Sequence, residues 1–154
     1  MSQRALPSRS RFARRLLRRD ESGAALVEFA LVFGLFVFIL YALIAFGMML
    51  ALKQSVTNAS AEAARAAVGI SDADDAEEKA METVADRLGW LGDKYQESDT
   101  TATVDFCSGT SGPKCITVQI AYPYSSRPLV PPAPGLGLIT PDTFGSTAVV
   151  QITS

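Results

Sequence analysis

A stretch of 24 residues without a charged side chain, Phe29 to Leu52, constrains this chain more than any other feature. A helix of about 20 apolar residues is enough to cross the hydrocarbon core of a bilayer, so this stretch has the required length. It contains no proline. We therefore expect residues 24–52 to form a transmembrane helix, which excludes an ordinary soluble monomer.

The charges differ on the two sides of this stretch. Residues 1–23 carry seven arginines against two acidic residues, a net charge of +5, and the remaining residues carry −7, which gives the total of −2. Basic residues beside a membrane helix are usually retained in the cytoplasm. We therefore expect residues 1–23 to be a basic cytoplasmic leader, followed by a single span and a domain outside the cytoplasm.

Helical patterns continue beyond the uncharged stretch. In residues 53–68, small or apolar residues recur at helical spacing, and we expect one continuous helix over residues 24–68 that ends at Gly69. Ser71 or Asp72 can cap a second helix with acidic residues in its first turns. The amphipathic stripe of that second helix consists of Ala76, Ala80, Val84 and Leu88.

Alternating residues then predict three short strands. Their apolar positions are Ala102, Val104 and Phe106; Ile116, Val118, Ile120 and Tyr122; and Ala148, Val150 and Ile152. Residues 123–145 hold six prolines and three glycines and are expected to form an extended surface loop. The predicted fold is therefore α+β: a long N-terminal helix (transmembrane, then protruding), a second helix and a three-stranded antiparallel sheet, with residues 69–154 as the exported domain.

The composition excludes several chemistries. The chain has no histidine, which excludes imidazole catalysis and histidine-ligated metal sites. Asp72, Asp74 and Asp75 lack the spacing of a calcium-binding EF-hand loop and fit a helix cap better. A basic run next to a membrane span more often determines topology than binds nucleic acid. We therefore expect no enzyme activity, no cofactor, no metal site and no nucleic-acid partner.

The two cysteines, Cys107 and Cys115, bracket the loop between the first two predicted strands. The charge distribution places them outside the cytoplasm, where disulfides persist. We therefore predict a disulfide between them.

One motif stands at the boundary between leader and helix. Gly23 closes the basic leader, and Glu28 is the fifth residue after it, within an apolar helix. This pattern resembles the type IV prepilin cleavage signal. The resemblance implies that a membrane aspartyl prepilin peptidase cuts after Gly23, that Ala24 becomes the N-terminus, and that Glu28 and Phe29 serve as the motif residues in assembly.

The following residues narrow the resemblance. The pieces Glu28 to Val32 (EFALV), Phe46-Gly47 and Asn58 to Arg65 (NASAEAAR) are similar to the TadE-like proteins of tight-adherence (Tad/Flp) pilus systems. The similarity covers residues 20–68 well. It implies a minor pilin or pseudopilin of a type IVb pilus that contributes to pilus assembly and adherence. Its implied partners are the prepilin peptidase, other pilins and membrane lipid, and its implied location is the bacterial inner membrane or a surface pilus.

Two other interpretations of the N-terminus remain. A cleaved secretory signal peptide is disfavoured, because its apolar region holds only about 7–15 residues. The chain could instead be an uncleaved single-pass membrane protein with an exported binding or sensing domain. That interpretation explains the charges but leaves Glu28 without a role.

Overall fold

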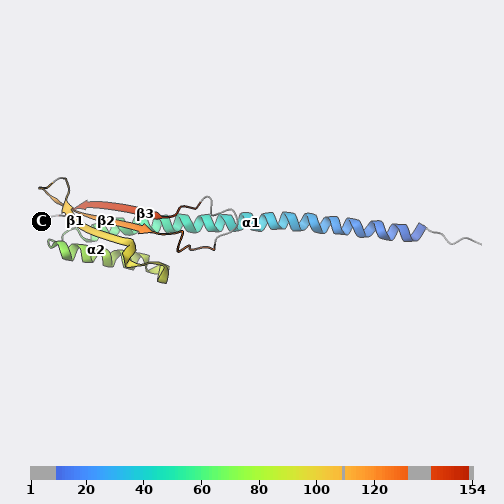
Figure 1. Cartoon of the computed structure of the whole chain (residues 1–154), viewed down its shortest axis with the longest axis horizontal. Coiled ribbons are helices and arrows are strands. Elements are labelled where there is room, and N and C mark those ends of the chain that lie inside the picture. Colours follow the sequence, from blue (N-terminus) through green and yellow to red (C-terminus); the bar gives the residue numbers. More distant parts are fainter. Residues whose placement is uncertain (1–9, 109, 132–139, 153–154) are drawn as a thin grey trace, which may run out of the picture. The chain divides into compact units, whose positions relative to one another are not determined.

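The computed structural model describes the backbone of residues 10–108, 110–131 and 140–152, and the side chains from Gly23 onward within these ranges (Figure 1). The chain divides into two compact units, residues 1–44 and 45–154. The elements confirm the α+β prediction. They are α1 (Ser10–Ala66), α2 (Ala73–Leu88), the 3-10 turns η1 (Gly89–Lys94) and η2 (Glu97–Asp99), and the strands β1 (Thr100–Phe106), β2 (Lys114–Tyr122) and β3 (Phe144–Gln151).

Helix α1 begins earlier than expected. We predicted its start at Ala24, and the structure places it at Ser10, 14 residues earlier. From Ser10 to Ser22 the chain contains neither proline nor glycine and is rich in arginine and leucine, which are good helix formers. Residues 10–23 therefore continue the helix backbone, and the prediction of the start was wrong.

The end of α1 agrees with the prediction. The helix ends at Ala66, and the amide of Val68 still donates to the carbonyl of Arg65 at 3.1 Å. Gly69 then adopts φ = +94°, a conformation that a residue with a side chain rarely takes. Gly69 is thus the predicted stop, and it directs the chain into α2.

Helix α2 also follows its sequence pattern. Asp72 is the N-cap, and its carboxylate accepts from the amides of Asp74 at 3.0 Å and Asp75 at 3.2 Å. Capping of this kind satisfies amides that have no partner inside the helix. The predicted stripe is fully buried: Ala76, Ala80, Val84 and Leu88. The acidic cluster is therefore a helix cap, as expected.

The sheet has the order β1-β2-β3, and both pairs are antiparallel. Partners share a face, so the register Ala102↔Val118↔Ala148 brings the predicted apolar positions of all three strands together. On β2 these positions, from Ile116 to Tyr122, are fully buried. The opposite face is mostly threonine and glutamine. The sheet therefore packs through one face and presents a polar one.

The core of residues 45–154 lies between that inner face and the two helices. A stripe of α1 is buried in it, with a spacing of three or four residues: Ala45, Met49, Leu52, Val56, Ala59 and Ala63; Ala67, just after the helix, continues it. The hydroxyls of Ser60 and Ser146 lie 2.8 Å apart, which joins α1 to β3. The burial of Met49 and Leu52 shows that the domain covers one side of the last turns of the uncharged stretch.

The segment after β2 is more ordered than the surface loop we predicted. Tyr124 is buried, and its ring packs edge-on against Phe144 at 5.2 Å between centroids. The hydroxyl of Tyr122 donates to the carbonyl of Arg127 at 2.7 Å. The prediction is therefore wrong for Tyr124, whereas Ser125 and Ser126 lie exposed in a turn, and Phe144 and Gly145 belong to β3. Residues 132–139 of the predicted loop lie outside the described part.

Candidate functional site

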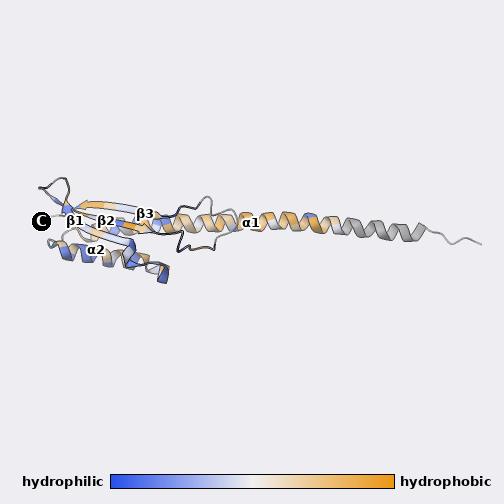
Figure 2. Ribbon diagram, in the orientation of Figure 1, coloured by the Kyte–Doolittle hydropathy of each residue, from blue (hydrophilic) through white to orange (hydrophobic). Residues whose placement is uncertain are grey.

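The predicted processing and assembly residues lie on the first part of α1. From Gly23 to Leu40 every described side chain is exposed. Most of these side chains are apolar (Figure 2), and Phe29 and Leu31 leave 66% and 70% of their surface uncovered. Residues Gly23–Ala66 are long and apolar enough to cross a membrane. A helix that is apolar on all sides needs lipid or other helices around it.

Gly23 and Ala24 lie inside α1. An ideal Cβ built on Gly23 meets nothing within 4 Å. Because both residues lie in α1, the peptide bond between Gly23 and Ala24 is part of a regular helix, in which the carbonyl of Gly23 accepts from the amide four residues later. Glycine in a helix interior costs about 1 kcal/mol relative to alanine. The helix is therefore intrinsically weak at the predicted cleavage position.

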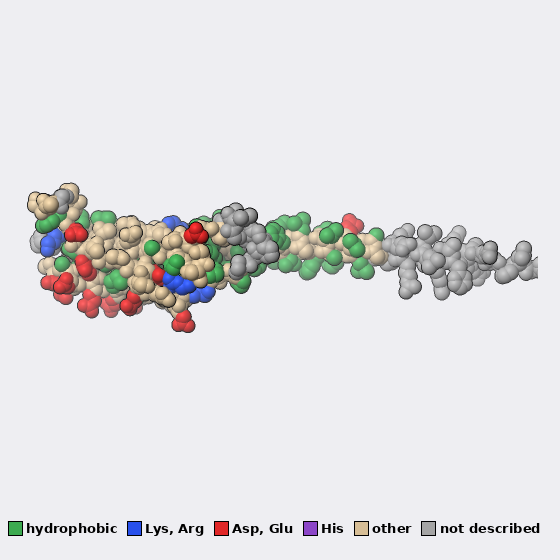
Figure 3. All heavy atoms as spheres, in the orientation of Figure 1, with side chains coloured by type: hydrophobic (Ala, Val, Ile, Leu, Met, Phe, Trp, Pro, Cys, Tyr) green, Lys and Arg blue, Asp and Glu red, His purple; other side chains and the backbone are tan. Residues whose placement is uncertain are grey.

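Glu28 lies one turn beyond Ala24 on the same side of the helix. Its side chain is exposed, and no other acidic residue occurs between Gly23 and Ala61. The space-filling view shows apolar side chains around this part of α1 (Figure 3). Phe29, the next motif residue, stacks on Phe33 with 5.7 Å between ring centroids. The structure therefore presents a lone carboxylate on an otherwise apolar helix surface.

The structure joins Cys107 and Cys115 in the predicted disulfide, with their Cα atoms 4.9 Å apart. The bond closes the loop between β1 and β2. The amide of Cys107 also donates to the carbonyl of Pro113 at 2.9 Å within that loop. These bonds fix the end of the sheet at which Phe106 pairs with Lys114.

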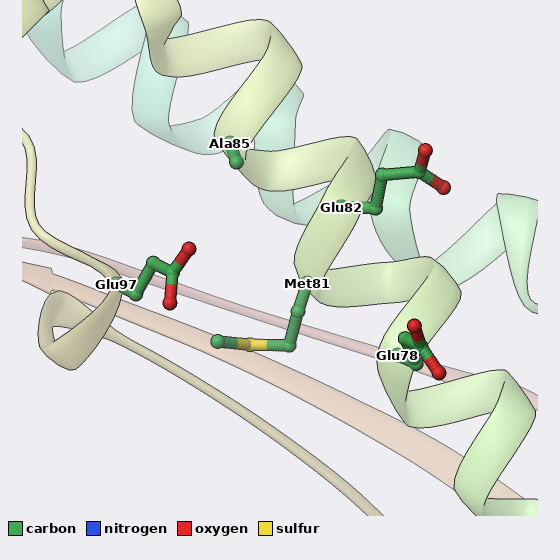
Figure 4. A pocket seen from close by; sticks show the side chains of 5 residues that line it. All are labelled: Glu78, Met81, Glu82, Ala85 and Glu97. Atoms are coloured by element: carbon green, nitrogen blue, oxygen red, sulfur yellow. The ribbon is translucent and has the colours of Figure 1, made fainter.

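A hollow of about 430 Å³ opens beside α2, lined by Glu78, Met81, Glu82, Ala85 and Glu97 (Figure 4). The Met81 side chain extends from α2 toward the η2 segment that carries Glu97. Lys79 neutralises part of the charge by donating to Glu82 at 2.6 Å. Among the residues that the structure describes, no group of three acidic or cysteine side chains is placed to hold a metal ion.

A polar cluster that the sequence did not indicate connects the segment after β2 to the η1 and η2 segments. Arg127 donates from Nη2 to Asp99 and from Nη1 to the carbonyl of Lys94, and its guanidinium lies 5.3 Å from the centroid of the Tyr122 ring. The hydrogen bond that Arg127 donates to Asp99 raises the pKa of Arg127, and burial raises the pKa of Tyr122. Only a prediction of long-range pairing could have found this cluster, because its members are far apart in sequence.

Comparison with models of known protein families gives a match for part of the chain. The family model described as TadE-like protein matches residues 23–65, which begin at the predicted cleavage glycine. No curated protein and no solved structure matches the chain. The resemblance predicted from the sequence is thus confirmed for residues 23–65, where the chain is similar to TadE-like proteins.

Proposed function

We propose that this chain is a minor pilin or pseudopilin of a Tad-type pilus. A prepilin peptidase would cleave it after Gly23, and the mature chain would contribute to pilus assembly and adherence. The observation that carries the proposal is the register of Gly23 and Glu28 at the start of an exposed apolar helix, inside the TadE-like match. The chain would insert in the bacterial inner membrane with its N-terminus in the cytoplasm.

The first step is hydrolysis of the bond between Gly23 and Ala24. Because this bond lies within α1, the peptidase must open the helix locally before it can reach the carbonyl. The low helix propensity of glycine reduces the cost of that opening by about 1 kcal/mol relative to alanine. The open space around Gly23 supports a clean test, since a larger residue there would not disturb the rest of the chain.

The second step is pairing of charges during assembly. Cleavage removes the +5 leader and creates an α-ammonium at Ala24, whose ordinary pKa of about 7.7–8.0 keeps it mostly protonated at neutral pH. Glu28 lies about 6 Å further along the helix axis. A neighbouring subunit shifted by about one turn would bring its Glu28 to this ammonium. An unpaired ion in an apolar bundle costs several kcal/mol, so this pairing favours assembly.

The third step is burial of the exposed apolar surface. Before assembly, lipid would cover the large apolar side chains of residues 26–44, and in the pilus other pilin helices would replace it. Ala30 and Gly34 are small residues four apart, a spacing that allows membrane helices to approach closely. A Cβ built on Gly34 meets nothing within 4 Å, so the chain itself leaves this space open for a partner.

A genetic experiment tests the proposal. Deletion of the gene should remove the surface pilus and adherence, and the wild-type chain should restore both. The variant Gly23→Val should keep residues 1–23 and should not restore the pilus or adherence. The control Gly34→Val, which changes another glycine of the same helix, should still lose residues 1–23. If the Gly23→Val precursor restores adherence while retaining residues 1–23, the chain is instead an uncleaved single-pass anchor with an exported binding or sensing domain.

A further inference from the structure

A groove of about 200 Å³ lies where the domain meets the end of the uncharged stretch. It is lined by Phe46, Met49, Leu50, Lys53, Pro141 and Phe144, and Lys53 is the only charged side chain among these. Met49 and Phe144 are buried, whereas Phe46 and Leu50 keep 58% and 50% of their surface exposed. The groove is therefore an apolar hollow with one cation at its edge.

Helix arithmetic places this groove at the level of a membrane surface. The uncharged stretch is bounded by Glu28 and Lys53, and its 24 residues measure about 36 Å along a helix. The hydrocarbon core of a bilayer is about 30 Å thick. With Glu28 at the cytoplasmic headgroups, Lys53 therefore reaches the headgroups of the opposite leaflet. Phe46 and Leu50 then lie just below those headgroups, beside the part of the acyl chains that is close to the glycerol.

A second observation points to the same level. Trp90, in η1, donates from its indole nitrogen to the hydroxyl of Ser55 at 3.0 Å, two residues beyond Lys53. Half of its surface (51%) is exposed. Tryptophan is enriched at membrane interfaces, where its ring meets apolar groups and its N–H meets polar ones. The same end of the domain thus carries an exposed indole, an apolar groove and a lysine.

We propose that this end of the domain rests on the extracytoplasmic surface of the membrane that α1 crosses, and that the groove binds a phospholipid. An acyl chain packs against Phe46 and Leu50, and the lipid phosphate accepts a hydrogen bond from Lys53. Lys53 donates to the carbonyl of Gly145 at 2.6 Å, and a lysine ammonium has two further donors. This contact would set the height of the domain above the bilayer before assembly.

The proposal rests on the exported, membrane-anchored part of the proposed function and is independent of cleavage. Precursor and mature chain share residues 45–154, so both should dock. A chain that retains residues 1–23 would contradict the proposed cleavage but not the proposed lipid contact. A chain that shows no lipid contact would contradict the contact but not the cleavage.

The sole tryptophan makes the contact measurable. The full chain is reconstituted in vesicles of phosphatidylcholine and phosphatidylglycerol whose acyl chains carry bromine either near the glycerol or near the methyl end. Trp90 fluorescence should be quenched more by the bromine near the glycerol. A control chain, Trp90→Phe with Phe106→Trp, moves the indole to the other end of the sheet, about 20–25 Å away along the strands. That chain should show almost no quenching.

The variant Lys53→Glu tests the phosphate contact. Repulsion between its carboxylate and the lipid phosphate should remove most of the quenching of Trp90. Lys114→Glu, at the far end of β2, should leave the quenching unchanged. Circular dichroism and an intact disulfide establish that both variants are folded. Equal quenching of the two tryptophan positions, or unchanged quenching in folded Lys53→Glu, would overturn the proposal and assign the groove to a neighbouring pilin helix.

Discussion

Arg127 donates from Nη2 to Oδ1 of Asp99 at 2.5 Å, and this ion pair ties the segment after β2 to the turn that precedes β1. The two side chains keep only 18% and 6% of their surface exposed. The second oxygen of Asp99 accepts from the amide of Gln96 at 3.1 Å, so the carboxylate is paired on both sides. The pair is thus the main polar link between two segments that are 28 residues apart.

Replacement of Arg127 by methionine should destabilise the domain markedly. The methionine keeps an apolar stem beside the Tyr122 ring but leaves the Asp99 carboxylate buried without its cation, which costs about 3 kcal/mol. The matched control is Lys79→Met, because the pair of Lys79 with Glu82 keeps 49% and 62% of its side-chain surface exposed and should contribute less than about 1 kcal/mol. Urea unfolding in detergent, followed by Trp90 fluorescence, measures both. Equal losses in the two variants would show that the Asp99 pair has no special role.

Alkaline pH should destabilise the same region. Burial raises the pKa values of Tyr95 and Tyr122 above the ordinary 10.0; the hydrogen bond between Tyr95 and Thr100 and the charge of Arg127 beside Tyr122 oppose the shift. A pKa raised by folding means that the folded state holds the proton more tightly. This contribution is complete below pH 10 and is lost as the pH rises through the folded-state values.

The variant Tyr122→Phe separates this effect from packing. It loses the hydrogen bond to the carbonyl of Arg127, so its free energy of unfolding at neutral pH should be lower by about 1 kcal/mol. Above pH 10 its stability should fall less steeply than that of the wild type. Urea titrations at a series of pH values measure both slopes, and identical slopes would argue against an ionisation of Tyr122.

The disulfide should be intact in protein isolated without reductant. Intact mass after alkylation should show no free thiol at Cys107 or Cys115. Replacing both cysteines by serine should lower the free energy of unfolding by roughly 2–3 kcal/mol, because the bond closes a short loop in the unfolded chain. Two alkylated thiols in the wild-type protein would contradict the bond and the exported location of the domain.

Glu28→Ala should separate assembly from the earlier steps. Insertion should be preserved, since removal of a carboxylate from an apolar helix favours partitioning into lipid. Leader removal should also persist, because Gly23 is unchanged. Assembly should fail, since the Ala24 ammonium then lacks a counter-charge in the bundle. Glu28→Asp, which keeps the charge, serves as control. Membrane fractionation, leader removal and the pilin content of sheared pili are the three measurements, and normal assembly of Glu28→Ala would remove the pairing role.

Local patterns in the sequence were sufficient to predict most elements. The stripe of α2, its Asp72 cap and the stop at Gly69 depend on residues within a few positions of one another, and the structure confirms them. The alternation in the three strands likewise predicts the inner face of the sheet, since the register pairs apolar positions. One exception is Phe106, which lies at the strand end and remains 43% exposed.

The features that were missed depend on distant or competing interactions. The pairing of Arg127 with Asp99 has no local signal, and proline content alone favoured a surface loop over the packed turn around Tyr124. The uncharged stretch made Met49 and Leu52 look like lipid-facing residues, because an apolar side chain fits a protein core equally well. The groove at Lys53 likewise required the position of Phe144 relative to α1.

The mass of the membrane-resident chain tests the central claim most directly. The wild-type chain is expressed with and without its cognate prepilin peptidase, extracted from the membrane, and analysed by intact mass and N-terminal sequencing. The account predicts that the chain starts at Ala24 with the peptidase and retains residues 1–23 without it. A chain that keeps Met1–Gly23 in the presence of the active peptidase, or that begins at another residue, would contradict processing at Gly23.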